Sequence, residues 1–427
     1  MKTVKFYTLG CKVNHYETEA MKNLFEARGY TVTEEYIADV FVINTCTVTA
    51  VGDKKSRQMI GRAKKGNPKA VIAVVGCYSQ VSPDEVRRLD EVDIILGTTD
   101  RIKIVDYVED FAGFRIDAVK SDIKAEFEEL PPSRQSRTRA VLKIQDGCNN
   151  FCTYCIIPRA RGPIRSRQLN SAVNEAAALA ARGFSEIVLT GIHLSSYGRE
   201  TGLSLLDPIR EIAAIPEIKR IRLSSLEPMI LTDDFVKEAA KTEKLCPSFH
   251  VSMQSGCDDT LKRMNRRYSS AQYLEALDRL RTAFPGCGIT TDVMVGFPGE
   301  TEEEFEKSCD TVRKAAFAGI HVFPYSCRPG TPAAEMKEQL SNSVKSERSH
   351  IMIEIGEQLK QSFAQRLIGT TEEVLFEAPS GEYFEGLTKS YVRVMAKGGS
   401  LSEVYANVVI KEYKDGICFG EIEESLC

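Results

Sequence analysis

Apolar and polar positions follow two alternating periods along the first 115 residues. Short β-branched runs, namely VKFYTLG, VFVINT, AVIAVVG and VDIILG, are separated by amphipathic stretches such as those near Tyr16 to Arg28 and Pro83 to Leu89. Strand-length apolar runs that alternate with helix-period segments predict a parallel sheet covered by helices. We therefore expect a parallel α/β domain over residues 1–115.

A second region, residues 137–365, repeats this alternation six times. Its strand candidates are RAVLKI, EIVLTG, RIRLSS, FHVSM, ITTDVMVGF and IHVFPYS, and helical patterns such as NSAVNEAAALAAR, SAQYLEALDRLRTA and TEEEFEKSCDTVRKAA lie between them. Six βα units predict a partial or complete barrel, in which working residues gather on the loops that follow the strands.

The remaining segments differ from both regions. Residues 116–136 contain acidic residues, a Pro pair and no sustained hydrophobic period, which predicts a linker. Over residues 369–427, short strands separated by Gly turns predict a small antiparallel β-barrel of a kind that often binds RNA. This tail has five Lys or Arg against eleven Asp or Glu, so a purely structural role is the alternative.

The number of cysteines matters because of the expected compartment. The chain has 13 cysteines, starts MKTVKFYTLG without the apolar core of a signal peptide, and has no apolar run near the roughly 18 residues of a membrane span. We therefore expect a cytoplasmic protein with no membrane partner. Thiols stay reduced there, so clustered cysteines indicate metal binding before disulfides.

Three cysteines in the stretch CNNFCTYC, which are Cys148, Cys152 and Cys155, follow the first predicted barrel strand. Three thiolates are one fewer than the four ligands of an ordinary structural zinc site or cubane cluster. A four-iron cluster held here would keep one iron open to a ligand that is not protein. Further glycine and polar residues follow the later strands at the same expected end of the barrel; they include Gly191, His193, Glu227, Gln254 and Gly296.

A second set of three cysteines has no local spacing. Cys11, Cys46 and Cys77 each follow a predicted strand of the N-terminal domain. The carboxyl ends of neighbouring parallel strands line one crevice, so we expect the three thiols to meet. Three unrelated buried cysteines are the alternative. The other cysteines show no ligand spacing and are interpreted as structural: Cys246, Cys257, Cys287, Cys309, Cys327, Cys418 and Cys427.

The distribution of charge differs from its total. The net charge of −4 argues weakly against a nucleic-acid partner, but residues 53–69 carry seven Lys or Arg against one Asp, and residues 133–167 carry eight against one. A third basic cluster lies at residues 262–267. Each block alone is typical of a solvated helix face, whereas three blocks around a cysteine site favour an RNA or other polyanionic substrate.

The motif CxxxCxxC after the first strand of a βα barrel, with Tyr154 just before the last cysteine, resembles the radical S-adenosylmethionine (SAM) enzymes. The full chain resembles the methylthiotransferases, through TLGCKVN, NTCTVT, VGCYSQ, HVSMQSGCDDTLKRM, GFPGET, PYSCRPGTPAA and a tail similar to the family's TRAM domain. Within that family, GCKVN and SMQSG are most similar to the tRNA branch that acts on N6-threonylcarbamoyladenosine.

The resemblance implies a reaction and its cofactors. N6-threonylcarbamoyladenosine at tRNA position 37, 3′ of the anticodon, would become its 2-methylthio derivative with two SAM molecules and two [4Fe-4S] clusters. The cluster on Cys148, Cys152 and Cys155 would cleave SAM to a carbon radical, because no ordinary side-chain base removes the unactivated C2–H of adenine. The cluster on Cys11, Cys46 and Cys77 would hold the inserted sulfur. An electron donor such as flavodoxin or ferredoxin and a sulfur source would be partners.

Further roles follow by matching the family's motifs. Tyr154 would lie near the adenine of SAM, and the backbone of Gly191 would contact its methionine amino group. Glu227, Gln254 and Gly296 would contact the rest of SAM. Basic residues would lead the tRNA anticodon arm to the gap between the clusters; these are Lys54, Lys55, Arg57, Arg159, Arg161, Arg165 and Arg167.

Several alternatives stay open. The same chemistry on isopentenyladenosine-37 or on a ribosomal-protein aspartate would keep the cysteine motifs and change the acceptor. A non-catalytic iron–sulfur carrier or RNA-binding scaffold would not require the glycine and polar residues at the strand ends, and it would not form 5′-deoxyadenosine. Zinc on the six cysteines would give a colourless protein, whereas iron–sulfur clusters would make it brown.

Overall fold

The computed structural model describes residues 2–123, 125–132, 138–398 and 404–426. The chain divides into two compact units. Unit 1 comprises residues 1–179, 189–208 and 326–335, and unit 2 comprises residues 180–188, 209–325 and 336–427. Within the described residues, no helix combines the length and the apolar character that a membrane span needs.

Unit 1 begins with a six-stranded sheet in which every pair of neighbouring strands is parallel. The strands lie in the order β2-β1-β3-β4-β5-β6. Their bounds are β1 Thr3–Thr8, β2 Thr31–Val32, β3 Val40–Thr45, β4 Val71–Gly76, β5 Ile94–Ile95 and β6 Ile116–Asp117. The predicted parallel α/β fold of this region is confirmed.

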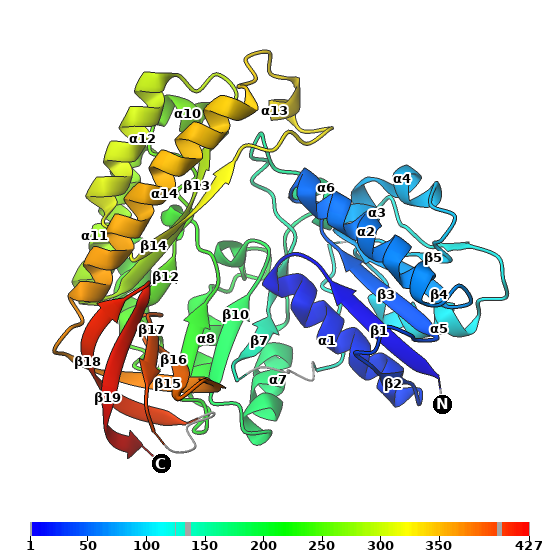
Figure 1. The fold of residues 1–427 in the computed structure, drawn as a ribbon, viewed down its shortest axis with the longest axis horizontal. Coiled ribbons are helices and arrows are strands. Elements are labelled where there is room, and N and C mark those ends of the chain that lie inside the picture. The colour runs from blue at the N-terminus through cyan, green and yellow to red at the C-terminus, as the bar shows by residue number, and fades with distance from the viewer. Residues whose placement is uncertain (1, 124, 133–137, 399–403, 427) are drawn as a thin grey trace. The chain divides into compact units, whose positions relative to one another are not determined.

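Helices cover both faces of this sheet, because its strands are apolar on both sides. Along β3, Val40 and Val42 pack into one core with α1 and α5, while Phe41 and Ile43 pack into the other core with α2, α3 and α4 (Figure 1). The helices are α1 Lys12–Ala27, α2 Ala50–Gly66, α3 Cys77–Val81, α4 Pro83–Arg87, the 3-10 helix η1 Arg101–Lys103 and α5 Ile104–Glu109.

The segment predicted as a linker, residues 116–136, is partly bound to unit 1. It begins with β6, and its Glu128 and Glu129 pair with Arg101 at 2.7 Å and with Arg167 at 2.8 Å. Its residues 124 and 133–136 lie outside the described part of the chain. The other elements of unit 1 are β7 Ala140–Lys143, β8 Gln145–Asp146, α6 Ile157–Arg161, β9 Arg165–Ser166, α7 Leu169–Ala181, η2 Leu194–Ser196 and α13 Pro332–Glu335.

The predicted alternation of strands and helices continues through the central region. Of the six predicted barrel strands, β7 lies in unit 1 and β10 (Glu186–Thr190) runs from unit 2 into unit 1. The other four lie wholly in unit 2. Strands β12, β13 and β14 pair in parallel. The elements are α8 Leu206–Ala213, β11 Arg220–Leu223, η3 Pro228–Ile230, α9 Asp233–Ala240, β12 Ser248–His250, α10 Asp258–Arg263, α11 Ser270–Ala283, β13 Gly288–Val295, α12 Glu302–Ala315, β14 Gly319–Pro324 and α14 Asn342–Gln365.

Local sequence signals explain where two of these helices begin. Helix α11 starts after a capping box between Ser269 and Gln272, and α12 starts after one between Thr301 and Glu304. In each box the side chains bond the exposed backbone N–H groups of the first turn, which would otherwise lack partners. These boxes place the helix starts where the sequence pattern predicts them.

The C-terminal tail forms a closed five-stranded barrel, β15-β16-β17-β19-β18 (Figure 1). Its strands are β15 Thr371–Ser380, β16 Tyr383–Thr388, β17 Arg393–Ala396, β18 Tyr405–Lys414 and β19 Ile417–Leu426. The predicted small barrel is confirmed, with one correction to its antiparallel description. Strands β17 and β19 pair in parallel and close the barrel, while the other neighbouring pairs are antiparallel.

Two buried arginines on β11 attach this barrel within unit 2. Arg222 donates to the backbone carbonyls of Thr388 and Lys389, each at 2.8 Å, and its Nε pairs with Glu186 at 2.7 Å. Arg220 pairs with Glu373 at 2.7 Å. Hydrogen bonds from a charged donor are stronger than neutral ones, so these bonds hold the barrel firmly.

Candidate active site

The three cysteines of the N-terminal domain gather at the carboxyl edge of its sheet. Cys11 follows β1 by two intervening residues, and Cys46 and Cys77 come directly after β3 and β4, which are neighbours in the sheet. A Cβ atom on Gly10 would lie only 2.9 Å from Cys46 Sγ, so the segment that carries Cys11 touches Cys46. The predicted meeting of the two strand ends is therefore seen directly.

Two glycines permit this close approach. Gly10 and Gly76 both have φ +102°, a left-handed conformation that other residues rarely adopt. Asn14 fixes the same turn from α1, because its Nδ2 donates to the carbonyls of Leu9 and Thr45 at 2.8 and 2.9 Å. The site is thus built by tight turns and by an amide that bonds two strand ends.

The thiols of this set differ in exposure. Cys11 is exposed, Cys46 is half-buried and Cys77 is buried. Burial raises the pKa of the Cys46 thiol, and it raises the pKa of the Cys77 thiol from 9.0 to about 11 against the lowering effect of Arg161. Metal binding requires the thiolate. A set of three neighbouring thiols with a cation beside the most buried one fits an iron–sulfur cluster, whose iron would displace the thiol protons.

The second set, Cys148, Cys152 and Cys155, lies on a loop between β8 and α6 in the same unit. The Cys148 N–H donates to Gly162 O at 3.1 Å, and the Cys155 N–H donates to Cys152 O at 2.9 Å. Gly147, at φ +72°, precedes the loop; a Cβ atom there would lie 1.8 Å from Pro163 O. Only glycine fits this approach, which brings the start of the cysteine loop against the segment that follows α6.

Residues after β10 contact this cysteine loop within unit 1. Gln145 Oε1 accepts the His193 N–H at 2.7 Å, and Gln145 Nε2 donates to Gly147 O at 2.9 Å. A Cβ atom on Gly191 would lie 2.8 Å from that same Oε1 atom. The structure therefore brings Gly191 beside the segment that leads into the cysteine loop, and its role as a SAM contact stays a prediction.

Aromatic residues of the cysteine loop are accessible to different degrees. Tyr154 is half-buried, and the neighbouring Thr153 O accepts the Ala333 N–H at 2.9 Å. Phe151 is 64% exposed and has φ +49°, an uncommon conformation for an aromatic residue. The strained turn at Phe151 lies between the first two cysteines of the motif.

The predicted SAM contacts Glu227, Gln254 and Gly296 lie in unit 2 and occupy loops after strands. Glu227 pairs with Arg266 at 2.5 Å. Gln254 has φ +65° and bonds along β13 through its backbone. The Gly296 N–H donates at 2.7 Å to the buried carboxylate of Glu300. Their role as SAM contacts stays a prediction.

The two basic segments that were predicted to bind RNA differ in exposure. Lys54, Lys55 and Arg57 are exposed on α2, and Arg159 is exposed on α6. In contrast, three arginines of the second segment are buried and paired with carboxylates, so their prediction as RNA-binding residues is wrong. They are Arg161, Arg165 and Arg167, at 0%, 2% and 4% exposure. Arg134 and Arg137 lie outside the described residues.

Sequence reasoning missed the true surroundings of Arg161. Its Nε donates to Cys77 Sγ at 3.3 Å, one Nη donates to Asn14 Oδ1 at 2.5 Å, and the other donates to Glu17 Oε1 at 2.5 Å. Arg161 thus links the helix after the second cysteine set to the first set. A signal was present in GCKVNHYE, where Cys11, Asn14 and Glu17 repeat at intervals of three and therefore share one helix face.

Arg328 also contacts the segment that follows the first set's Cys46. Arg328, on the segment after β14, is buried and bonds Thr47 Oγ1 at 2.5 Å and Asp53 at 2.6 Å. Both partners follow Cys46 closely in the sequence. Its neighbour Cys327 is exposed, whereas the other cysteines interpreted as structural are buried within the described chain: Cys246, Cys257, Cys287, Cys309 and Cys418.

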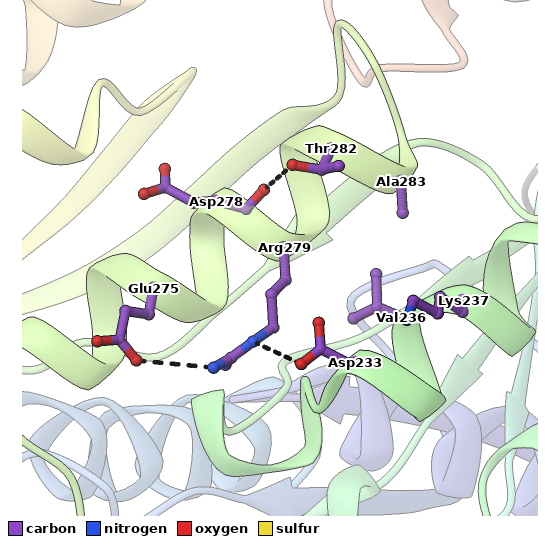
Figure 2. Close-up of a pocket in the computed structure, with 8 residues that line it drawn as sticks. All are labelled: Asp233, Val236, Lys237, Glu275, Asp278, Arg279, Thr282 and Ala283. Atoms are coloured by element: carbon purple, nitrogen blue, oxygen red, sulfur yellow. Dashed lines mark hydrogen bonds and ion pairs between the residues drawn. The ribbon is translucent and has the colours of Figure 1, made fainter.

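Two other features of unit 2 lack comparable chemistry. A pocket of about 360 Å³ lies between α9 and α11, where Arg279 pairs with Asp233 at 3.7 Å and with Glu275 at 3.6 Å (Figure 2). Elsewhere the ligand atoms of Cys257, Asp259 and Glu304 lie within 4.8 Å of one another. Glu304, however, already takes part in the capping box of α12, and its two oxygens pair with Arg263 at 2.5 and 2.9 Å. Neither feature contains a predicted site residue.

Comparisons with known protein families agree with this site. Residues 142–312 match the model of the radical SAM superfamily, and residues 3–97 match the uncharacterized protein family UPF0004. A solved radical SAM methyltransferase, TsrM from Kitasatospora setae, aligns with a TM-score of 0.58 at 16% identity over 78% of this chain and 77% of that chain. That likeness concerns the fold.

Curated relatives give a narrower result. The chain is 45% identical to the threonylcarbamoyladenosine tRNA methylthiotransferase MtaB of Bacillus subtilis, over 93% of this chain and 91% of that protein. It is 39% identical to MtaB of Thermotoga maritima, over 88% and 87% of the two chains. A tRNA-2-methylthio-N(6)-dimethylallyladenosine synthase from Endomicrobium trichonymphae is 34% identical over 97% and 98%. The chain belongs to the radical SAM methylthiotransferases and, within them, to the MtaB branch.

Proposed function

We propose that this chain is a tRNA methylthiotransferase that converts N6-threonylcarbamoyladenosine at position 37 to its 2-methylthio derivative. The observation that carries the proposal is the 45% identity to an MtaB protein over 93% of the chain. The two sets of three cysteines in unit 1 supply the thiolates that such chemistry needs. A relative named for dimethylallyladenosine is less similar, at 34% identity.

Cys148, Cys152 and Cys155 would hold a [4Fe-4S] cluster and leave one iron for SAM. The reduced cluster and the SAM bound to it would together supply a carbon radical that can remove the C2 hydrogen of adenine. The chain's own residues would shape the site: Gly147 and Gly162 allow the compact loop, and Gly191 lies beside Gln145, where only a hydrogen fits. Tyr154 would contact the adenine of SAM from within the loop.

Glu227, Gln254 and Gly296 would contact the rest of SAM. Two of these residues are held in left-handed conformations, with φ +65° at Gln254 and φ +70° at Gly296. At Gln254, which unlike glycine has a side chain, this conformation is strained, and such strain is found at ligand-binding positions, where surrounding contacts hold it. The neighbouring Glu300 is buried and bonded to Arg348 at 2.7 Å, which fixes the loop that carries Gly296.

Cys11, Cys46 and Cys77 would hold a second [4Fe-4S] cluster, which would hold the inserted sulfur. Their thiols share one edge of the sheet, and Gly10 and Asn14 keep the strand ends together. With one SAM molecule for methylation and one for the radical, the reaction uses two SAM molecules. An electron donor such as flavodoxin or ferredoxin and a sulfur source complete the set of partners.

The exposed face of α2 would contact the tRNA anticodon arm. It begins four residues after Cys46 and presents Lys54, Lys55 and Arg57 to solvent. Flexible cations on one helix face contact phosphates without reading the base sequence. Arg159, exposed on α6, would add a contact near the other cysteine set.

The experiment is a digest of bulk tRNA from cells with and without the gene, with methylthiolated nucleosides measured by mass spectrometry. We expect selective loss of 2-methylthio-N6-threonylcarbamoyladenosine, restored by the wild-type gene and not by the Cys148→Ala variant. Loss of the dimethylallyl nucleoside instead would assign the other acceptor. An unchanged profile in a strain that has no redundant enzyme would reject tRNA as the substrate.

A further inference from the structure

The buried Arg161 joins the two cysteine sets of unit 1. It is the last residue of α6, six residues after Cys155, and its guanidinium is fully buried. Its Nε lies 3.3 Å from the sulfur of Cys77, which is 84 positions away in the sequence. A buried arginine that donates one of its hydrogen bonds to a cysteine sulfur is unusual, because a neutral thiol is a weak acceptor.

The other donors of Arg161 fix the orientation of that bond. Nη1 donates to Glu17 Oε1 at 2.5 Å, and Nη2 donates to Glu17 Oε2 at 3.1 Å and to Asn14 Oδ1 at 2.5 Å. The planar guanidinium is held on two sides by one carboxylate and one amide. Its Nε–H is therefore aimed at Cys77 by a rigid fork.

A buried network of ion pairs surrounds Arg161. Among the described residues, these pairs join Arg101, Lys143, Arg161 and Arg165 to Glu17, Glu128 and Asp146. Buried charges are costly unless they are paired. The pairs therefore hold the guanidinium of Arg161 in place, with its Nε beside the sulfur of Cys77.

We propose that Arg161 is a positioning residue for the cluster on Cys11, Cys46 and Cys77: it donates a hydrogen bond to the Cys77 thiolate and raises the reduction potential of that cluster. This inference rests on the proposed function, which places a cluster on these cysteines. Hydrogen bonds to the sulfurs and nearby net charge both set the potential of an iron–sulfur cluster. A cation stabilises the reduced cluster, because that state carries one more negative charge.

The test uses the full chain with Cys148, Cys152 and Cys155 replaced by Ala, so that one cluster remains. This parent is reconstituted with iron and sulfide, its iron is counted, and its one-electron reduction by dithionite is followed by electron paramagnetic resonance against potential. Arg161→Gln is then compared with the parent. We expect an about tenfold lower ratio of reduced to oxidised cluster at a fixed potential, which corresponds to a midpoint about 59 mV more negative.

Two control variants separate the hydrogen bond from general charge and from folding. Arg101→Gln removes a buried cation of the same network, which pairs with Glu17 and Glu128. We expect a smaller shift of the midpoint potential in this variant than in Arg161→Gln. Arg161→Lys keeps the charge and loses the planar fork, so its potential should fall between those of the parent and Arg161→Gln. This variant keeps the inference testable if Arg161→Gln does not fold.

The outcomes are distinguishable. If the parent binds no cluster, the two-cluster assignment fails and the inference fails with it. If the parent binds a cluster whose potential and resonance spectrum are the same in Arg161→Gln or Arg161→Lys, the inference alone is overturned and Arg161 only stabilises the fold. Equal shifts in Arg161→Gln and Arg101→Gln would also overturn it, because the Cys77 contact would then have no specific effect.

Discussion

Two basic segments of this chain have similar charge in the sequence and opposite positions in the structure. Each follows a cysteine of one set: residues 53–69 follow Cys46, and residues 159–167 follow Cys155. The first lies on α2 with its lysines in solvent. The second contributes three buried arginines to ion pairs with Glu17, Asp146 and Glu175.

The difference shows what a local count of charge leaves out. The carboxylates that neutralise the second segment lie outside its own run, on α1, β8 and α7. The first segment has one acidic residue, Asp53, within its own run, and Arg328 takes it as a partner. A basic run is thus an RNA contact only where distant carboxylates do not reach it.

The largest effect is expected from the two cysteine sets, to which Cys46 and Cys155 belong. Cys11→Ala should abolish methylthiolated product and leave reductive cleavage of SAM intact, whereas Cys148→Ala should abolish both. Product and 5′-deoxyadenosine are measured by mass spectrometry in the same reaction. If Cys11→Ala also stops 5′-deoxyadenosine formation while its cluster on Cys148, Cys152 and Cys155 is fully loaded, the division between the two sets is wrong.

Removal of Glu17, the carboxylate on α1 that pairs with Arg161 of the second segment, should destabilise the protein strongly. Glu17 faces Arg101, Lys143 and Arg161, all buried. Glu17→Gln leaves these cations with less compensation and should lower the free energy of unfolding by about 3–5 kcal/mol. Urea unfolding measures it. The matched control Glu19→Gln, on the same helix and paired only with Lys22 in its salt bridge, should cost less than about 1 kcal/mol.

The same carboxylate predicts an acid limit to stability. Burial alone would raise the pKa of Glu17, but Arg101, Arg161 and Lys143 outweigh it and lower the pKa from 4.5 to about 2. A group with a lowered folded-state pKa stabilises the fold above its unfolded pKa, and this contribution is lost as the pH falls from 4.5 to 2. The loss should be about 3 kcal/mol. Unfolding measured across this pH range should lose that slope in Glu17→Gln.

Arg167 provides a direct contrast with α2. It bonds Glu175 and lies 2.8 Å from Glu129, so Arg167→Gln should cost about 2 kcal/mol of stability. Because the side chain is buried, the slope of log affinity for tRNA against log salt should not change. A reduced slope, in a variant whose folded state is intact at the assay temperature, would return Arg167 to the RNA-binding set.

The smallest effect on stability is expected on α2. Lys54→Ala combined with Lys55→Ala should change the free energy of unfolding by less than about 0.5 kcal/mol. The salt slope of tRNA binding should fall by about 1 to 2, one for each lost phosphate contact. Lys237→Ala combined with Lys241→Ala, two exposed lysines near α9, removes the same charge as a control and should leave the slope unchanged.

The sequence predicts the strands and helices well where one period persists. The strands before Cys11, Cys46 and Cys77 are apolar on both faces, and that pattern belongs to parallel sheets. The parallel pair β17 and β19 was not predictable, because barrel closure joins strands that are not consecutive and their spacing in the chain does not show it. Residues 116–117 were assigned to a linker, since two residues are too few to show a period, yet they pair with β5.

The candidate site divides in the same way. Cysteine spacing and strand-end position indicate both thiol sets from the sequence, because these signals are local or follow from sheet topology. The surroundings of Arg161 depend on long-range packing. Its partners Asn14, Glu17 and Cys77 are separated from it by 84 positions or more, and a run of arginines gives no information on such contacts.

The hydrogen bonds from Arg220 and Arg222 to the C-terminal barrel determine which substitutions this tail tolerates. Arg222 bonds carbonyl oxygens of Thr388 and Lys389, which any amino acid supplies, and Arg220 adds the carbonyl of Glu373 to its bond with that side chain. Substitutions at positions 388 and 389 therefore keep most of the anchor. The outer surface of the tail, including its acidic residues, can therefore change during evolution without loss of this attachment.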